Sequence, residues 1–195
     1  MILEGIVTTI GADGAINVAP MGPRVDSSMS RLLLRPFRTA RTYANLKANG
    51  EGVFHVSDDV LLLARAAVGA LDPLPPLFPA AYVRGQVLAD ACRYYEFRVT
   101  HCDESADRVA FEADVVHVAR LRDFFGFNRA KHAVVEAAIL ATRMAILGPA
   151  EIAREFARLA PLVEKTGGER EHQAFAFLEE YVRQSTQYSV DPTSK

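Results

Sequence analysis

The sequence predicts an α+β protein, mainly β, in which strands fill about the first 120 residues and helices the rest. Two observations carry this prediction. Apolar and polar residues alternate in 94–102 and in 109–117, a pattern typical of antiparallel strands with one buried face. From Asn128 onward the apolar spacing changes to the helical period of about 3.6 residues. We therefore expect one domain over residues 1–120 and a helical extension over 121–195.

Composition excludes several classes of protein. The 195 residues carry 22 Lys and Arg against 24 Asp and Glu, and this net charge of −2 argues against a globally basic nucleic-acid-binding protein. Two cysteines are too few for a disulfide framework. No apolar run approaches the roughly 20 residues of a membrane span, and the N-terminus lacks the basic start of a signal peptide. We expect a cytoplasmic protein without a nucleic-acid or membrane partner.

The first strands are expected to begin with a hairpin. Residues 2–10 carry apolar side chains on both faces, and Asp13-Gly14 is a typical hairpin turn. Residues 15–18 then return as the second strand, which stops at Pro20. Residues 31–34 predict a third strand, which ends before Pro36.

Short helices and further strands follow in the sequence. Thr39–Asn49 predicts a helix capped by Thr39 and ended by Gly50. Residues 53–56 predict a strand, and residues 58–68 a helix capped by Ser57 or Asp58. Four prolines in 70–81 predict a stiff loop. The expected helices of the C-terminal part span 129–147, 150–164 and 169–187, separated by Gly148-Pro149 and by Gly167-Gly168.

The strongest functional signal is an uneven distribution of charge. Between Ser27 and Gly50 there is no acid but there are five bases, and Arg38 and Arg41 flank the expected cap, Thr39. Cations at a helix N-terminus are unfavourable, because that end of the helix is already positive. A bound phosphate would make them favourable. The sequence thus predicts an anion site here, and the alternative is that the arginines pair with surface acids.

Two further segments support a ligand site. Asn128 is expected to cap the helix that follows it, with Arg129 and Lys131 in the first turn, where acids are preferred. This second basic helix start suggests one anion held from two sides, or a ligand with a neighbouring substrate; alternatively, Lys131 only reaches out from a buried helix. In Asn17–Pro23 a strand runs into a loop between two prolines, and Gly22 would allow close approach of a ligand, although a plain turn has the same pattern.

These segments together resemble the flavin-reductase-like, FMN-binding split β-barrel family. That family carries Asn-x-Ala-Pro-x-Ser after its second strand, then Asp-Thr-x-x-Asn-Ile, then Gly-Glu-Phe-Val-Val-Asn-Val. The matching stretches, in the same order and at similar spacing, are Asn17-Val18-Ala19-Pro20-Met21-Gly22, Arg41-Thr42-Tyr43-Ala44-Asn45-Leu46 and Gly50-Glu51-Gly52-Val53-Phe54-His55-Val56. The resemblance covers residues 1–118, and it is greatest to an uncharacterised branch of the superfamily that has C-terminal helices of its own.

The resemblance implies a split β-barrel that forms a homodimer with FMN at the subunit interface. It implies that the flavin phosphate contacts Arg35, Arg38, Thr39, Arg41 and Thr42. It implies that the backbone of Ala19, Pro20, Met21 and Gly22 lines the isoalloxazine ring, and that Asn128, Arg129 and Lys131 approach the phosphate or an anionic substrate. Gly22 replaces the family's serine, Arg41 its aspartate and His55 its asparagine, and the last two changes alter the charge near the cofactor.

The function expected from this resemblance is that of an FMN-dependent oxidoreductase or flavin reductase, with a small-molecule electron donor and acceptor. The flavin would carry the hydride, so no catalytic residue of the protein is singled out. The alternative is a non-catalytic carrier of a flavin or pterin. No metal site is expected, because the adjacent His101 and Cys102 point to opposite faces of one strand.

Overall fold

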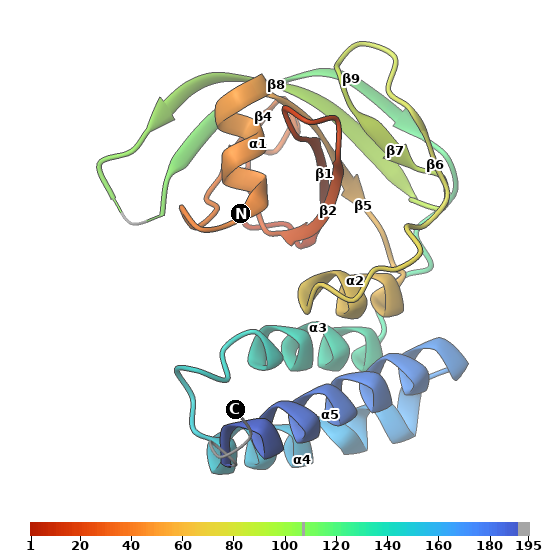
Figure 1. The fold of residues 1–195 in the computed structure, drawn as a ribbon. Helices are drawn as coiled ribbons and strands as arrows, with labels where there is room; N and C mark the ends of the chain where they lie inside the picture. The colour runs from red at the N-terminus through yellow and green to blue at the C-terminus, as the bar shows by residue number, and fades with distance from the viewer. Residues whose placement is uncertain (107, 191–195) are drawn as a thin grey trace. The chain divides into compact units, whose positions relative to one another are not determined.

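The computed structural model describes residues 1–106 and 108–190, which form two compact units (Figure 1). The first unit contains Met1–Asp58 and Pro73–Phe124. The second contains Asp59–Asp72 together with the chain from Phe125 onward. The sequence led us to expect a single domain boundary at residue 120. The structure instead assigns a segment from the middle of the chain to the second unit, because the helix in that segment packs with the C-terminal helices.

The first unit is built on a seven-stranded antiparallel sheet. Its strands, in spatial order, are β2 (Ile16–Met21), β1 (Gly5–Ile10), β5 (Glu51–Val56), β8 (Arg93–Asp103), β9 (Ala110–Arg120), β4 (Arg31–Leu34) and β3 (Arg24–Val25). The sheet is curled, and α1 (Arg41–Asn49) lies along its hollow side (Figure 1). A separate two-stranded sheet joins β6 (Leu77–Pro79) to β7 (Gln86–Leu88). The α+β class is as the sequence predicts.

The hollow side of the curled sheet is filled by a hydrophobic core. Leu46 of α1 packs there with side chains from six strands, including Val7, Leu34, Phe97 and Phe111, all of which are buried. The alternation predicted for β8 and β9 accounts for this, because Tyr95, Phe97 and Phe111 all face inward. The core thus fixes α1 against β1 and β2, the strands that lead into the candidate site.

The second unit consists of four helices packed on one another. They are α2 (Val60–Ala67), α3 (Arg129–Ala141), α4 (Pro149–Thr166) and α5 (Glu169–Val190). The buried face of α3 is made largely of alanine, which lets its neighbours approach closely, and it packs with Val60 and Ala64 of α2 and Leu178 of α5. No helix in the described part of the chain has both the length and the apolar character to cross a bilayer.

Several boundaries differ from the sequence-based expectations. The N-cap of α1 is Ala40, not Thr39, and that of α2 is Asp59, whose carboxylate accepts from the N–H groups of Leu61 and Leu62. The second strand continues through Pro20 to Met21, because β2 is an edge strand and a missing N–H is tolerated there. The proline-rich loop contains β6, which the sequence did not reveal.

The long apolar helix is also shorter than expected, because α3 ends at Ala141 rather than at residue 147. The chain turns there, with the N–H groups of Ile146 and Leu147 both bonded to the carbonyl of Arg143. The apolar run therefore includes a turn that precedes the Gly148-Pro149 start of α4.

Candidate functional site

The end of β2 forms one side of the candidate site. Ala19, Pro20 and Met21 are half-buried, and β2 pairs only with β1 within the seven-stranded sheet. Gly22, just beyond the strand, lies against the N-terminal segment: a Cβ built there would come 2.9 Å from Oε1 of Glu4 and from Cγ2 of Ile2. The side chains of the exposed Glu4 and Ile2 therefore lie against Gly22, and a larger residue there would displace them.

The start of α1 lies beside β2. Asn17 Nδ2 donates a hydrogen bond to Oγ1 of Thr42 over 3.0 Å, which ties the first turn of the helix to the strand. Thr9 of β1 accepts a hydrogen bond from Asn45 over 3.0 Å and extends this buried polar network. The network thus brings Thr42, predicted as a phosphate contact, close to the strand that ends in Ala19–Met21.

The first turn of α1 has unsatisfied backbone donors and no negative charge. Ala40 makes no side-chain cap and the first turn contains no acid. The first N–H groups of a helix have no partner inside the helix and point out from its positive end. Thr39, expected as the cap, is exposed one residue before Ala40. This helix start is therefore able to bind an anion.

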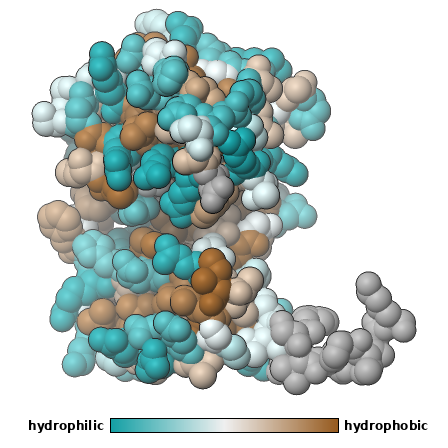
Figure 2. Space-filling view, turned by 90° about the vertical axis from the view of Figure 1, so that its left-hand side faces the viewer, coloured by the Kyte–Doolittle hydropathy of each residue, from teal (hydrophilic) through white to brown (hydrophobic). Residues whose placement is uncertain are grey.

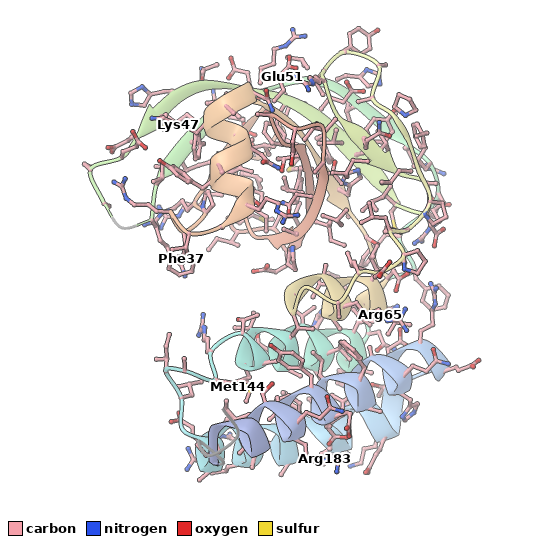
Figure 3. All side chains as sticks on the ribbon, viewed as in Figure 1. Phe37, Lys47, Glu51, Arg65, Met144 and Arg183 are labelled. Atoms are coloured by element: carbon pink, nitrogen blue, oxygen red, sulfur yellow. The ribbon has the colours of Figure 1, made fainter. Side chains whose placement is uncertain are left out.

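The arginines around α1 fall into two groups. Arg38 donates to the carbonyl of Glu104 and lies 3.9 Å from its carboxylate, which also accepts from Tyr43 and Lys47, each over 2.6 Å. The hydrogen bonds from Lys47 and then from Tyr43 lower the pKa of the Glu104 carboxyl below its ordinary value. Figure 3 shows Phe37 in the loop before α1 and Lys47 near the other end of the helix.

Arg35 and Arg41 form the other group. Both are exposed, and neither has an ion pair with any acid in residues 1–106 and 108–190. The surface-pair alternative thus describes Arg38. Arg41, the first residue of α1, and Arg35, six residues before it, have no such ion pair among the described residues. Sequence reasoning missed Glu104, because the carboxylate that neutralises this region lies more than fifty residues further along the chain.

His55 is a buried residue of the core rather than part of an open site. It has no exposed surface; its Nδ1 lies 3.1 Å from the carbonyl of Ile6, and its Nε2 accepts from the N–H of Leu88 over 3.1 Å. Because Nε2 accepts, Nδ1 must carry the proton, so the ring is neutral. Burial lowers the pKa of His55 to about 4. Both ring nitrogens are engaged within the protein.

Asn128, Arg129 and Lys131 belong to the helical unit. Asn128 caps α3 by accepting from the N–H of Lys131 over 3.1 Å, as predicted, and it donates to the carbonyl of Thr166. Lys131 forms a 2.7 Å ion pair with Glu171, whose carboxylate also accepts from the N–H of Gly168. Both side chains of the ion pair are largely buried. The charge of Lys131 is therefore balanced inside this unit, whereas Arg129 is exposed.

No three His, Cys, Asp or Glu side chains in the described residues are grouped as metal ligands would be. Figure 2 shows hydrophobic residues at the surface of the helical unit. Two of the most exposed apolar side chains there are Phe127 and Ile146, at 95% and 82% exposure.

Comparisons with known proteins identify relatives of this chain. A family model described as "Protein of unknown function (DUF447) N-terminal domain" matches residues 3–122, and a second model, "Protein of unknown function (DUF447)", matches residues 128–180. A search of curated proteins finds no match.

The similar solved structures share the fold. An FMN-bound protein of Methanosarcina mazei, described as DUF447, is 22% identical, with 92% of this chain and 94% of that one covered and a TM-score of 0.80. The Streptomyces globisporus NADH:FAD oxidoreductase is 16% identical, with 60% and 70% covered and a TM-score of 0.52. The styrene monooxygenase flavin reductase of Pseudomonas putida is 15% identical, with 60% and 77% covered and a TM-score of 0.51. The likeness establishes the fold, and it confirms the predicted split barrel with C-terminal helices.

Proposed function

The chain belongs to the DUF447 family, and from that premise we propose that it binds FMN and acts as a flavin-dependent oxidoreductase or flavin reductase. The observation that carries the proposal is the start of α1, which has no side-chain cap and no acid in its first turn. The exposed Arg35 and Arg41 precede and begin this helix, without an ion pair in the described chain. The FMN in the Methanosarcina mazei neighbour supports the choice of ligand.

The residues present fit the phosphate of FMN. The backbone N–H groups at the start of α1 would donate to its oxygens, and the guanidinium groups of Arg35 and Arg41 would balance its charge. Arg38 would contribute less, because it is already bonded to Glu104. Thr42 would hold the helix start in place through its bond with Asn17. A terminal phosphate monoester is the group that these donors recognise.

The ring of the flavin would lie against the end of β2. Ala19, Pro20 and Met21 stand on an edge strand, where backbone atoms on the unpaired side are able to face a ligand. When bound, FMN supplies the acceptance and release of hydride, so the protein has only to bind it, orient it and exclude water. His55 supplies no proton to such a step, because its ring is neutral, buried and bonded on both nitrogens.

The proposal includes a homodimer and a location in the cytoplasm. The apolar character of residues 129–147 is explained largely by packing inside the helical unit, so it gives little support to a dimer. The exposed phenylalanine and isoleucine side chains, Phe127 and Ile146, are the remaining support for a second copy. Light scattering at micromolar concentration tests the dimer, and a monomeric mass contradicts it.

The central test is a titration of the purified protein with FMN and with riboflavin, followed by flavin fluorescence. We expect FMN to bind more tightly, because riboflavin has no phosphate for the α1 start. Equal affinities would contradict the phosphate site. Oxidation of NADH or NADPH by the FMN-loaded protein, with a panel of acceptors, then tests catalysis. FMN binding without any turnover would support the alternative, a non-catalytic flavin or pterin carrier.

A further inference from the structure

Two arginines face each other across the β8–β9 pair. Arg93, the first residue of β8, is in register with Arg120, the last residue of β9, and both are exposed. Like charges directly opposite each other in a sheet are destabilising. Arg120 has a 2.8 Å ion pair with Asp123, but both side chains are mostly exposed, so the pair contributes little. Arg93 has no ion pair in the described part of the chain.

Arg122 completes the group but plays a different role. It donates to the carboxylate of Asp58 over 2.6 Å and to the carboxylate and carbonyl of Asp90, and it also bonds the carbonyl of Asp123. The bond to Asp58 is the main reason why the pKa of Arg122 is raised. Its N–H donors are used in bonds within the protein, so Arg122 forms part of the wall of a pocket rather than binding a ligand there. The guanidinium groups left for a ligand are those of Arg93 and Arg120.

These arginines line a pocket of about 310 Å³ in the barrel unit. Val56, Tyr95, Phe124 and the buried Cys92 supply apolar lining. The one acid of the lining, Asp123, is the exposed ion-pair partner of Arg120. Burial, followed by the charge of Asp58, raises the pKa of the Cys92 thiol, so this cysteine is not poised as a nucleophile. The volume lies at the lower end of the range typical of small-molecule sites, roughly 300–1,000 Å³.

We propose that this pocket binds a small organic anion, a molecule with a carboxylate or phosphate group attached to an apolar body. The anionic group would bridge Arg93 and Arg120, which would convert their repulsion into two charge-assisted contacts. The apolar body would pack on Tyr95 and Phe124. The hydrogen bond of Arg122 to the buried Asp58 carboxylate keeps the wall in place whether or not the ligand is bound.

The strand register places this pocket at the same end of the sheet as the proposed flavin site. Arg93 pairs with Val56 of β5, whose neighbour His55 pairs with Ile6 of β1, and Ile6 in turn pairs with Pro20 of β2. β8 lies three strand spacings from β2, which corresponds to roughly 15 Å along the sheet. If the proposed function holds, the anion is therefore a candidate for the substrate or electron donor. The proposal of an anion site does not depend on the proposed flavin-dependent function.

Calorimetric titration with benzoate, phenyl phosphate and benzyl alcohol tests the site. We expect the two anions to bind and the neutral alcohol not to bind. The anion with the higher affinity identifies whether the site prefers a carboxylate or a phosphate. Arg93→Gln and Arg120→Gln should each weaken anion binding about tenfold or more. Arg65→Gln is the matched control, since Arg65 is an exposed arginine of α2 in the other unit, and it should change nothing.

Two comparisons separate this site from the flavin site. Arg93→Gln should leave FMN affinity unchanged, whereas Arg41→Gln should lower FMN affinity and leave benzoate affinity unchanged. In an anion-poor buffer, Arg93→Gln should also melt at the same temperature as the native protein or higher, because it removes a like-charge pair. The proposal is overturned if both arginine variants bind benzoate as tightly as the native protein, or if benzyl alcohol binds equally well.

Discussion

The amide of Asn17 donates a hydrogen bond to the hydroxyl of Thr42, and this 3.0 Å contact joins the edge strand β2 to the first turn of α1. Thr42 is buried and Asn17 partly so. The Asn17–Pro23 segment and the basic helix start thus meet in one corner of the fold, near the beginning of β2. A ligand bound at this corner would meet backbone donors whose positions are fixed before it arrives.

Removing the hydroxyl of Thr42 should weaken this corner. In Thr42→Val the Asn17 amide loses its closest side-chain acceptor, so we expect the free energy of unfolding to fall by about 1.5 kcal/mol, with weaker FMN binding. Thr42→Ser keeps the hydroxyl and should retain FMN affinity. Urea unfolding and FMN titration of both variants measure the effect, and equal behaviour of the two would show that the hydrogen bond contributes nothing.

Arg41→Ala should separate ligand binding from stability. The loss of a charge-assisted hydrogen bond to the phosphate should reduce FMN affinity roughly ten- to a hundredfold. The protein without ligand should be as stable as before or slightly more so, because a cation leaves the positive end of α1. Titration calorimetry and thermal melts check both parts. Intact FMN affinity together with lower stability would contradict the phosphate site.

Glu96 supports the loop between β6 and β7, although the sequence pattern placed it on the polar face of its strand. It is fully buried, and its carboxylate accepts from the N–H groups of Ala81, Tyr82 and Val83 at 2.9, 2.6 and 3.0 Å. Glu96→Gln would place an amide N–H against these donors, so we expect a loss of about 2 kcal/mol or more. Glu112→Gln, on the exposed side of β9, is the control and should change stability little.

The buried His55 predicts a dependence of stability on pH. Its pKa of about 4 lies below the value near 6.5 of an unfolded chain, so the unfolded state binds the extra proton between these values. Its contribution, about 3 kcal/mol, is therefore complete above pH 6.5 and is lost as the pH falls toward 4. NMR titration of the imidazole should show His55 neutral at pH 5, with the exposed His101 as the comparison. Titration of His55 near pH 6.5 would refute this.

The sequence was sufficient for features that depend on neighbours along the chain. The alternation in β8 and β9, the left-handed Gly50 after α1, with φ of 63°, and the Asn128 cap follow from local preferences. Local preferences do not explain why Ala40 rather than Thr39 is the N-cap, because the hydroxyl of Thr39 would favour a helix start one residue earlier.

Long-range pairings could not be read from the sequence. Glu104 neutralises part of the basic segment around α1, and Glu171 pairs with Lys131, from 57 and 40 residues away respectively. The two irregularities in the β8–β9 pairing offset each other, so Arg93 and Arg120 share the register of Asp103 and Ala110 at the other end, and no pattern of residue types reveals this pairing. Charge patterns therefore indicated where an anion could bind, but only the fold showed which cations are free to bind it.

The helix α2 has a consequence for how the chain is made. A ribosome releases α2 long before α3 and α5, the helices against which Val60 and Ala64 pack, because α3 begins only at Arg129. Strands β6 to β9 of the first unit emerge in between. During this interval the apolar face of α2 has none of its native neighbours, so synthesis passes through a stage exposed to aggregation. A nascent chain stalled before residue 129 should accordingly recruit chaperones, and one released beyond α5 should not.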